Sequence, residues 1–250
     1  YGGLQYDVET TAMAEESKKY DLSNLLAIRG EIARGDSIFH DLQGTKEEIL
    51  KIENILKDNK WQVTPYMGKN GTEESFLDMN GKSPRLLHLA THGFYYTPNK
   101  AENVDYLKGY TDAMSLSGLV MSGGNAAWLG KQLPKGVLGG ILTANDIARL
   151  DLSNTDMAVL SACQTGQGKA TAEGLYGLQR AFKKAGVGTI VMSLWNVSDK
   201  TTSEFMTTFY ERLADKNNAW NKRKAFEETK EIIRKKHPDP YLWAAFVMLD

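Results

Sequence analysis

The sequence predicts an α/β fold, with a mostly parallel central sheet and helices on both of its faces. Short apolar runs alternate with segments whose apolar residues recur every three or four positions, which is typical of parallel sheets with helical crossovers. Two of the apolar runs end at reactive side chains: residues 86–91 lead into His92, and residues 158–162 lead into Cys163. Reactive groups of open α/β sheets gather outside the carboxyl ends of the strands, so we expect both side chains at one edge of the sheet.

The first half of the chain predicts alternating strands and helices. Thr45 and Glu48 have the spacing of a capping box, and the isoleucines that follow fall on one helical face. Thr72 is expected to cap a short helix, which Pro84 ends. Residues 10–44 show no clean period and stay unassigned. The predicted elements are a strand at 4–8, an amphipathic helix at 46–58, a strand at 61–66, a short helix at 72–79 and a strand that ends at His92.

In the second half, residues 93–140 lack a regular period and are rich in turn formers, so they predict a long loop. We interpret this loop as a flap over a substrate cleft. Regular structure returns at Thr143, which with Asp146 marks a helix start, and Gly186 is expected to end a later helix. The predicted elements are a strand leading to Cys163, a helix at 172–184, a strand at 188–194, a helix from Ser198, a helix at 220–235 and a strand at 243–249.

The composition is that of an ordinary globular protein. The 250 residues are 42% hydrophobic and 24% charged, which favours one domain over two. Lys and Arg number 30 against 31 Asp and Glu, so charge favours neither nucleic acid nor a membrane surface as a partner. The single cysteine, together with the lack of a signal peptide or a long apolar run, predicts a cytoplasmic setting. Because the chain starts at Tyr1 in a strand-like pattern, we expect it to be part of a longer protein.

The pair His92 and Cys163 has the chemistry of a thiol peptidase. Neighbouring strands lie ~4.8 Å apart, so a histidine and a cysteine at the ends of adjacent strands can exchange a proton. A thiol with a pKa of ~8.5 needs only modest activation by an imidazole to become a strong nucleophile. The backbone N–H groups of Gly93 and Cys163 are the natural donors to the oxyanion that develops during acyl transfer.

Other interpretations stay open at this point. A single cysteine at the end of an apolar strand is also typical of a buried thiol, and a histidine beside a turn glycine is often structural. The joint placement of His92 and Cys163 favours the dyad. His88 lies in the middle of a predicted strand, where we expect a hydrogen-bonded core histidine, whereas His40 and His237 have no such context.

No metal or cofactor is predicted. The Gly168-Lys169 turn is not a phosphate-binding loop, because Cys163 stands in place of its first glycine and Ala170 in place of its Ser or Thr. The sequence around Ser122 lacks the first glycine of a nucleophile elbow. The chain also has no cluster of Cys and His residues spaced for zinc.

Several strings, spread over nearly the whole chain, resemble the CHAT family of caspase-like peptidases. This resemblance implies a caspase-like three-layer sandwich and carries the catalytic dyad onto His92 and Cys163. Caspases themselves have a different sequence around the cysteine, so their preference for aspartate is not assumed. The strings are Tyr1-Gly-Gly-Leu-Gln-Tyr6, Leu-Ala-Thr-His92-Gly93, Leu-Ser-Ala-Cys163-Gln-Thr-Gly166, Glu173-Gly174-Leu175, Gln179-Arg180-Ala181-Phe182, Ser193-Leu194-Trp195-Asn-Val-Ser-Asp199 and Pro240-Tyr-Leu-Trp243-Ala-Ala-Phe246.

For substrate binding, the resemblance implies that Ser193 to Trp195 flank the peptide and pair with it as an added strand. Packing in the core is the alternative for Trp195. Asp146 and Asp199 are candidates to line a pocket for a basic side chain, although each also has the position of a helix cap. Glu173 has the same two interpretations beside the cysteine turn, and a pocket for a small or hydrophobic residue remains an alternative.

The resemblance also implies a regulated enzyme. The family is commonly attached to tetratricopeptide repeats or other sensors, and some members act in bacterial defence by cleaving a partner protein. We therefore expect a cysteine endopeptidase with a protein substrate and a sensor region. The alternative is a non-catalytic caspase-like module that binds partners in a signalling scaffold.

Overall fold

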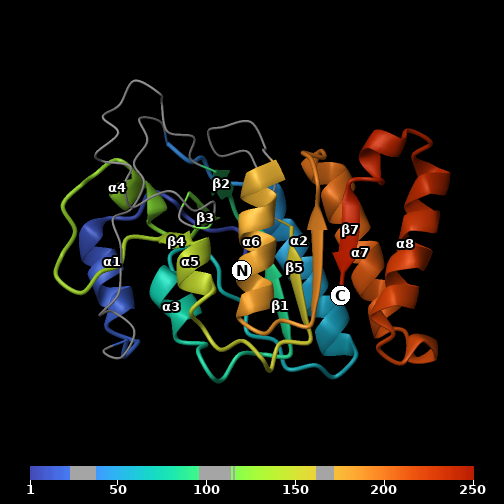
Figure 1. The fold of residues 1–250 in the computed structure, drawn as a ribbon, viewed down its shortest axis with the longest axis horizontal. Helices are drawn as coiled ribbons and strands as arrows, with labels where there is room; N and C mark the ends of the chain where they lie inside the picture. Colours follow the sequence, from blue (N-terminus) through green and yellow to red (C-terminus); the bar gives the residue numbers. More distant parts are fainter. Residues whose placement is uncertain (23–37, 96–113, 115, 162–171) are drawn as a thin grey trace.

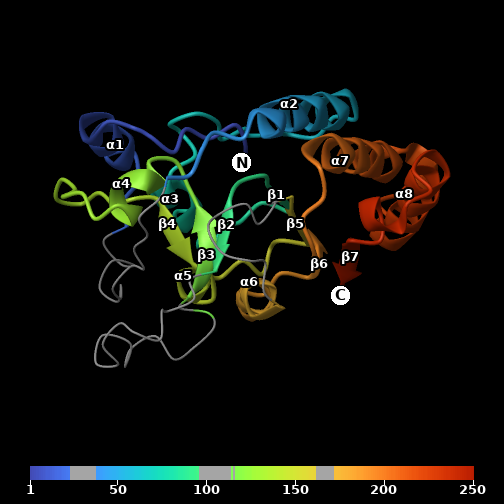
Figure 2. The same ribbon diagram turned by 90° about the horizontal axis from the view of Figure 1, so that it is seen from above.

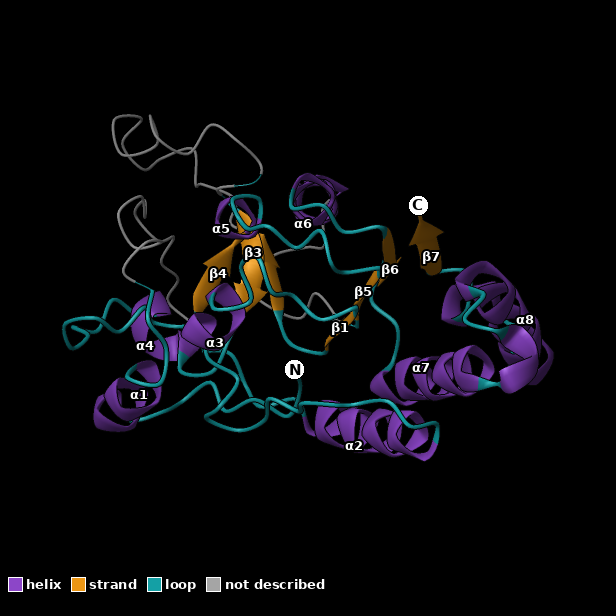
Figure 3. Ribbon diagram, turned by 90° about the horizontal axis from the view of Figure 1, so that it is seen from below, coloured by secondary structure: helices purple, strands orange, loops and turns teal. Residues whose placement is uncertain are grey.

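The protein is a three-layer α/β structure (Figure 1), seen here in a computed structural model that describes residues 1–22, 38–95, 114, 116–161 and 172–250. A four-stranded sheet in the order β1-β5-β6-β7 forms the middle layer. Helix α6 covers one face of this sheet, and helices α2, α7 and α8 lie on the other (Figures 2 and 3). The predicted fold class, a mostly parallel sheet with helices on both faces, is confirmed.

The central strands follow the sequence prediction closely. β1 (Leu86–Leu89), β5 (Met157–Leu160) and β6 (Thr189–Ser193) run parallel, and β7 (Phe246–Leu249) joins β6 antiparallel. Every residue of β5 is buried, as expected for an inner strand whose two faces are both covered. The last strand was predicted from residue 243 but begins three residues later, because Pro240–Leu242 form a 3-10 turn.

Helix α6 (Ala172–Lys184) has the predicted bounds and packs on one face of the sheet. Its Leu178 and Phe182 are buried in the larger core cluster. Gly186 follows the helix with φ +97°, a conformation that favours glycine and confirms the predicted helix stop.

The opposite face of the sheet is covered by α2 (Gln43–Asp58), α7 (Asp199–Ala214) and α8 (Lys222–Lys236). The predicted stripes are buried here, including Ile49 and Ile52 of α2 and Phe205 of α7. The capping box predicted for Thr45 and Glu48 was wrong. The helix starts two residues before Thr45, so the Thr45 hydroxyl donates to Leu42 O and the Glu48 side chain is directed into the core.

Residues 93–140 were predicted as a loop, which is correct for residues 129–140 and wrong for the strands and the helix that come before them in the described chain. β2 (Gly93–Tyr95), β3 (Ser117–Val120) and β4 (Ile141–Thr143) form a second, antiparallel sheet of three strands, and β3 is followed by α4 (Gly124–Trp128). The glycines interpreted as turn formers include Gly124, which is the first residue of α4 and where an added Cβ would lie 2.4 Å from Val120 Cγ1. Residues 96–113 and 115, the centre of the proposed flap, lie outside the described part of the chain.

Two short helices begin at the predicted caps. The Thr72 hydroxyl accepts from Ser75 N at the start of α3 (Glu73–Leu77). Thr143 and Asp146 form a reciprocal capping box at the start of α5 (Ala144–Ile147). These caps confirm both predicted starts.

The amino-terminal region differs most from the prediction. Helix α1 (Thr10–Ser17) forms where no element was assigned. The predicted strand at 4–8 is reduced to one parallel bridge between Leu4 and Gly68, and residues 61–66 belong to no strand of the described chain. A strand requires a hydrogen-bonded neighbour, which alternation in one segment does not guarantee.

Among the described residues, none of the helices combines the length and the apolar character that crossing a bilayer requires.

Candidate active site

The candidate site lies at the carboxyl ends of β1 and β5. These strands are adjacent and parallel, and Leu89 pairs with Leu160 at their last rung. His92 follows Leu89 by three residues. Cys163 follows Leu160 by the same number but lies outside the described residues. The structure therefore confirms that the two strands are neighbours, and it describes the histidine half of the predicted dyad.

His92 is held in a fixed orientation by its surroundings. Its side chain is buried, with the whole residue 4% exposed, and Nε2 donates to the backbone carbonyl of His40 at 2.7 Å. The imidazole packs against the rings of Tyr6 and Phe39, with centroids 4.8 Å and 5.4 Å away. An oriented imidazole is the arrangement that a positioned general base requires.

The hydrogen bond to His40 fixes which nitrogen carries the proton. A carbonyl oxygen only accepts, so Nε2 of His92 must be the protonated nitrogen. In the neutral ring the lone pair is then on Nδ1. Nδ1 is thus the atom of His92 that can take a proton.

Burial lowers the pKa of His92 below its ordinary value, because the charged ring loses hydration. The His40 carbonyl opposes this shift in pKa, the nearby His40 ring adds to it, and the carboxylates of Asp199 and Asp41 oppose it more weakly. His92 is therefore mainly neutral at neutral pH, as a general base should be.

Asn125, in α4, holds the segment that orients His92. Its side chain is fully buried, accepts from Phe39 N at 2.8 Å and donates to Phe39 O at 2.9 Å. The next residue, His40, supplies the carbonyl that binds His92. The region predicted as a loop therefore contributes the residue that fixes this segment in place.

Gly93 begins β2 and presents its N–H away from β3. Val120 N donates to His92 O at 2.8 Å, so Gly93 and Leu119 form the non-hydrogen-bonded type of antiparallel pair. The peptide groups of a residue in such a pair point away from the partner strand. The Gly93 N–H is thus compatible with a role outside the ladder.

The predicted substrate-binding acids lie in different settings. The Asp146 carboxylate accepts from Thr143 N at 3.1 Å and from the Thr143 hydroxyl, which makes it a helix cap. Asp199 is exposed in the first turn of α7, near Gly44, and its charge acts on His92. Glu173 lies in α6, but its side chain is outside the described part of the structure.

Ser193 and Trp195 lie at the end of β6. Ser193 pairs with Phe246 of β7, and β6 continues one residue beyond its last pair with β5. Trp195 is half-buried against the smaller core cluster, and its Nε1 donates to Tyr241 O at 2.8 Å. The packing interpretation of Trp195 thus has support, and its role in substrate binding stays a prediction.

Sequence reasoning missed Tyr6, Phe39, His40 and Asn125 as residues around the site. His40 acts through its main chain, so no side-chain pattern could have indicated it. For Tyr6, the signal that was missed is its place within the string that opens the chain. Its hydroxyl lies 2.8 Å from Thr91 Oγ1, next to His92.

His88 is a hydrogen-bonded core histidine, as predicted. Its Nδ1 lies 2.9 Å from the Tyr210 hydroxyl, and its Nε2 lies 2.8 Å from Glu48 Oε1. This polar group links α2, β1 and α7 beneath the candidate site. Within the described ranges no group of three His, Cys, Asp or Glu side chains is placed to hold a metal ion.

Comparisons with known proteins agree with this architecture. A family model of the CHAT domain matches residues 8–250. Tetratricopeptide repeat protein 28 from Mus musculus and from Homo sapiens are each 32% identical to this chain over 111 residues. The alignment covers 44% of this chain and 4% of each relative, so the chain spans a small part of their length. The match over most of the chain shows that this protein belongs to the CHAT domain family.

Proposed function

We propose that this chain is a single caspase-like peptidase domain, in which Cys163 is the nucleophile and His92 the general base of a cysteine endopeptidase. The observation that carries the proposal is the equal offset of the two residues, each three positions after a rung shared by adjacent parallel strands. Reactive groups at the carboxyl ends of neighbouring strands converge on one site.

In the proposed reaction, Nδ1 of His92 accepts the thiol proton of Cys163, and the thiolate attacks the carbonyl carbon of the scissile peptide bond. The N–H groups of Gly93 and Cys163 donate to the oxyanion, and the orientation of the Gly93 N–H away from β3 supports its part. Collapse of the tetrahedral intermediate breaks the C–N bond, and the imidazolium gives its proton to the leaving amine. Water, deprotonated by His92, then hydrolyses the thioester and regenerates the thiol.

For the substrate, we propose an extended peptide that pairs with residues 193–195 as an added strand. Of the candidate acids, Asp199 is the one best suited to meet a basic side chain, since it is exposed and its charge already acts on His92. Asp146 is less suited because its carboxylate caps α5. Glu173 remains a candidate on sequence grounds.

The names of the relatives support a proposal about regulation. Both are tetratricopeptide repeat proteins. We propose that this domain, too, is attached to or associated with a sensor region, such as tetratricopeptide repeats, and acts as a switched protease in bacterial defence or programmed cell death.

A non-catalytic binding module is the second candidate function, and the deep burial of His92 among aromatic rings is the observation that favours it. Covalent labelling with an electrophilic cysteine probe separates the two. The chain has one cysteine, so any thiol label reports on Cys163 alone. An endopeptidase requires fast labelling that is lost in His92→Ala and retained in His237→Ala, a histidine whose Nε2 lies 2.8 Å from Glu204 Oε2. Equal labelling of all three proteins would overturn the dyad.

Cleavage-site mapping tests the reaction itself. Proteomes treated with the activated full-length protein should gain new amino termini that the Cys163→Ala protein does not produce. The residues before the new termini would identify the substrate pocket, and an absence of new termini from an activated, probe-reactive protein would contradict the endopeptidase assignment.

A further inference from the structure

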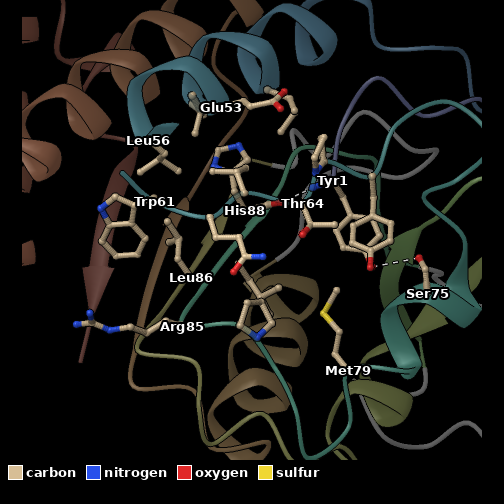
Figure 4. Close-up of a pocket in the computed structure, with 18 of the residues that line it drawn as sticks. Tyr1, Glu53, Leu56, Trp61, Thr64, Ser75, Met79, Arg85, Leu86 and His88 are labelled. Carbon is tan, nitrogen blue, oxygen red and sulfur yellow. Dashed lines mark hydrogen bonds between the residues drawn. The ribbon is translucent and has the colours of Figure 1, made fainter. Parts of the chain in front are cut away.

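The central sheet has an incomplete edge at β1. β1 is an outer strand of the sheet, and a cavity of about 360 Å³ lies beside it. Segment 61–66, which the sequence predicted as a strand, lines this cavity together with residues 84–88. Figure 4 shows Trp61 and Thr64 around the cavity with Leu86 and His88.

Tyr1 is already hydrogen-bonded to this edge as a parallel strand would be. Tyr1 N donates to His88 O at 2.7 Å, and Ala90 N donates to Tyr1 O at 2.8 Å. In a parallel pair, one residue forms hydrogen bonds to both sequence neighbours of the residue that lies opposite it. Tyr1 therefore lies opposite Leu89 and runs in the same direction as β1.

On the side away from β1, the residues after Tyr1 pair with the end of segment 61–66 and with Gly68. Gly2 N donates to Tyr66 O at 3.2 Å, and Leu4 forms a parallel bridge with Gly68. Residues 1–4 thus lie between β1 and residues 66–68. A strand that continued backwards from Tyr1 in the same direction would run along β1 into the cavity.

The edge of β1 has backbone groups directed into this cavity. Arg85 O accepts from β5, and peptide groups of successive strand residues alternate in direction, so Leu86 and His88 face the other way. His88 O is used by Tyr1. Between described residues, no hydrogen bond engages the His88 N–H or the Leu86 carbonyl.

The walls of the cavity suit apolar side chains. The Tyr1 ring is directed toward α3 and lies against Phe76, whereas a Cβ added at Gly2 would meet Ile49 of α2. By alternation, a residue before Tyr1 would point toward α2, where Ile52 and Leu56 line the cavity. The next residue back would point to the opposite face, near Met79.

We propose that this cavity is a slot for one more strand, and that an extended apolar segment joined to the amino group of Tyr1 in a longer polypeptide fills it. The segment runs parallel to β1, and segment 61–66 becomes the new edge of the sheet. Burial lowers the pKa of the Tyr1 amino group to about 5, which shows that a charge is unfavourable at this position. A peptide N–H at Tyr1 would donate to His88 O without that charge.

Hydrogen exchange tests the proposal without reference to catalysis. A polypeptide that extends upstream of Tyr1 is compared with residues 1–250 alone. In the longer form, the His88 amide and alternate amides of the upstream segment should exchange on the order of a hundredfold slower than unpaired amides. The Ala90 amide, bonded to Tyr1 O in both forms, is the internal control.

Two results would overturn the proposal. One is exchange of the upstream residues at the rate of an unstructured peptide. The other is protection of His88 that appears only as protein concentration rises, which would assign the slot to a second copy of the chain. A variant with lysine directly before Tyr1, placed against Ile52, should return the His88 amide to its rate in residues 1–250. Unchanged protection in that variant would exclude the slot.

Discussion

Nε2 of His92 donates a hydrogen bond of 2.7 Å to the backbone carbonyl of His40, which lies 52 residues earlier in the chain. This bond fixes the tautomer of His92 and leaves Nδ1 as its basic nitrogen. The carbonyl is held in place by Asn125, which binds both backbone groups of Phe39. The candidate base is thus positioned by the second sheet region as well as by β1.

Replacing Asn125 should disturb His92 without touching it. Asn125→Ala leaves the Phe39 N–H and carbonyl without their partner, which should lower the free energy of unfolding by about 1–3 kcal/mol. Labelling of Cys163 by an electrophile should slow by about tenfold. This factor corresponds to a rise of ~1.4 kcal/mol in the activation free energy when the base is displaced. Asn125→Asp keeps the acceptor for Phe39 N but places a buried carboxylate against Phe39 O, so it should be at least as destabilising as Asn125→Ala. A normal labelling rate in Asn125→Ala, with stability reduced, would limit Asn125 to a structural role.

The pH profile of Cys163 labelling should reflect the lowered pKa of His92. The imidazole accepts a proton only when neutral, so the rate should rise with pH through a limb that lies below the ordinary histidine value of ~6.5. Asp199→Asn removes a charge that raises this pKa, so its limb should move to lower pH. Asp215→Asn, which changes a half-buried carboxylate that caps the turn at the other end of α7, is the matched control. A limb above the ordinary value would contradict the burial argument.

Stability should depend on pH in the same sense. The folded-state pKa of His92 lies below its unfolded value, so the unfolded chain binds more protons as pH falls below ~6.5. The stability contribution is present above the unfolded pKa and is lost as pH falls toward the folded pKa. The loss between pH 7 and pH 5, measured by denaturant unfolding, should be smaller in His92→Asn than in the parent. Identical curves would show that the two states have the same pKa.

The polar group around His88 should matter for stability and not for labelling. Tyr210→Phe removes the hydroxyl that meets His88 Nδ1 in the buried core, and the expected cost is about 1–3 kcal/mol. Tyr241→Phe changes a tyrosine that is 56% exposed and should cost less than ~0.5 kcal/mol. Both variants should label at the parent rate once folded. A slow-labelling Tyr210→Phe protein would show that this group is coupled to the active site.

The central sheet could be predicted because both its strands and its helices have strong local patterns. β5 is a short apolar run, and α6 has a clear stripe that ends at Gly186. Segment 61–66 has the pattern of a strand but has no strand partner in the described chain. Pairing is a long-range property, and local alternation cannot report it.

The site could be predicted only in part for a related reason. His92 and Gly93 stand at the end of an apolar run and could be found by position. The residues that orient His92 come from an aperiodic segment and from α4, where the pair Gly123 and Gly124 hid the start of a helix behind a loop-like composition. Gly124 lies in close contact with Val120 and Gly140 but was interpreted as a turn residue, so α4 was missed.

Because the acceptor for His92 is a main-chain atom, substitutions at position 40 cannot remove it. An alanine scan would therefore identify His92 and, through Phe39, Asn125, yet find little at His40 itself. The group that orients the imidazole would be invisible to side-chain mutagenesis and free to vary in identity. Its presence in other members of the family would have to be recognised from backbone geometry rather than from an aligned residue.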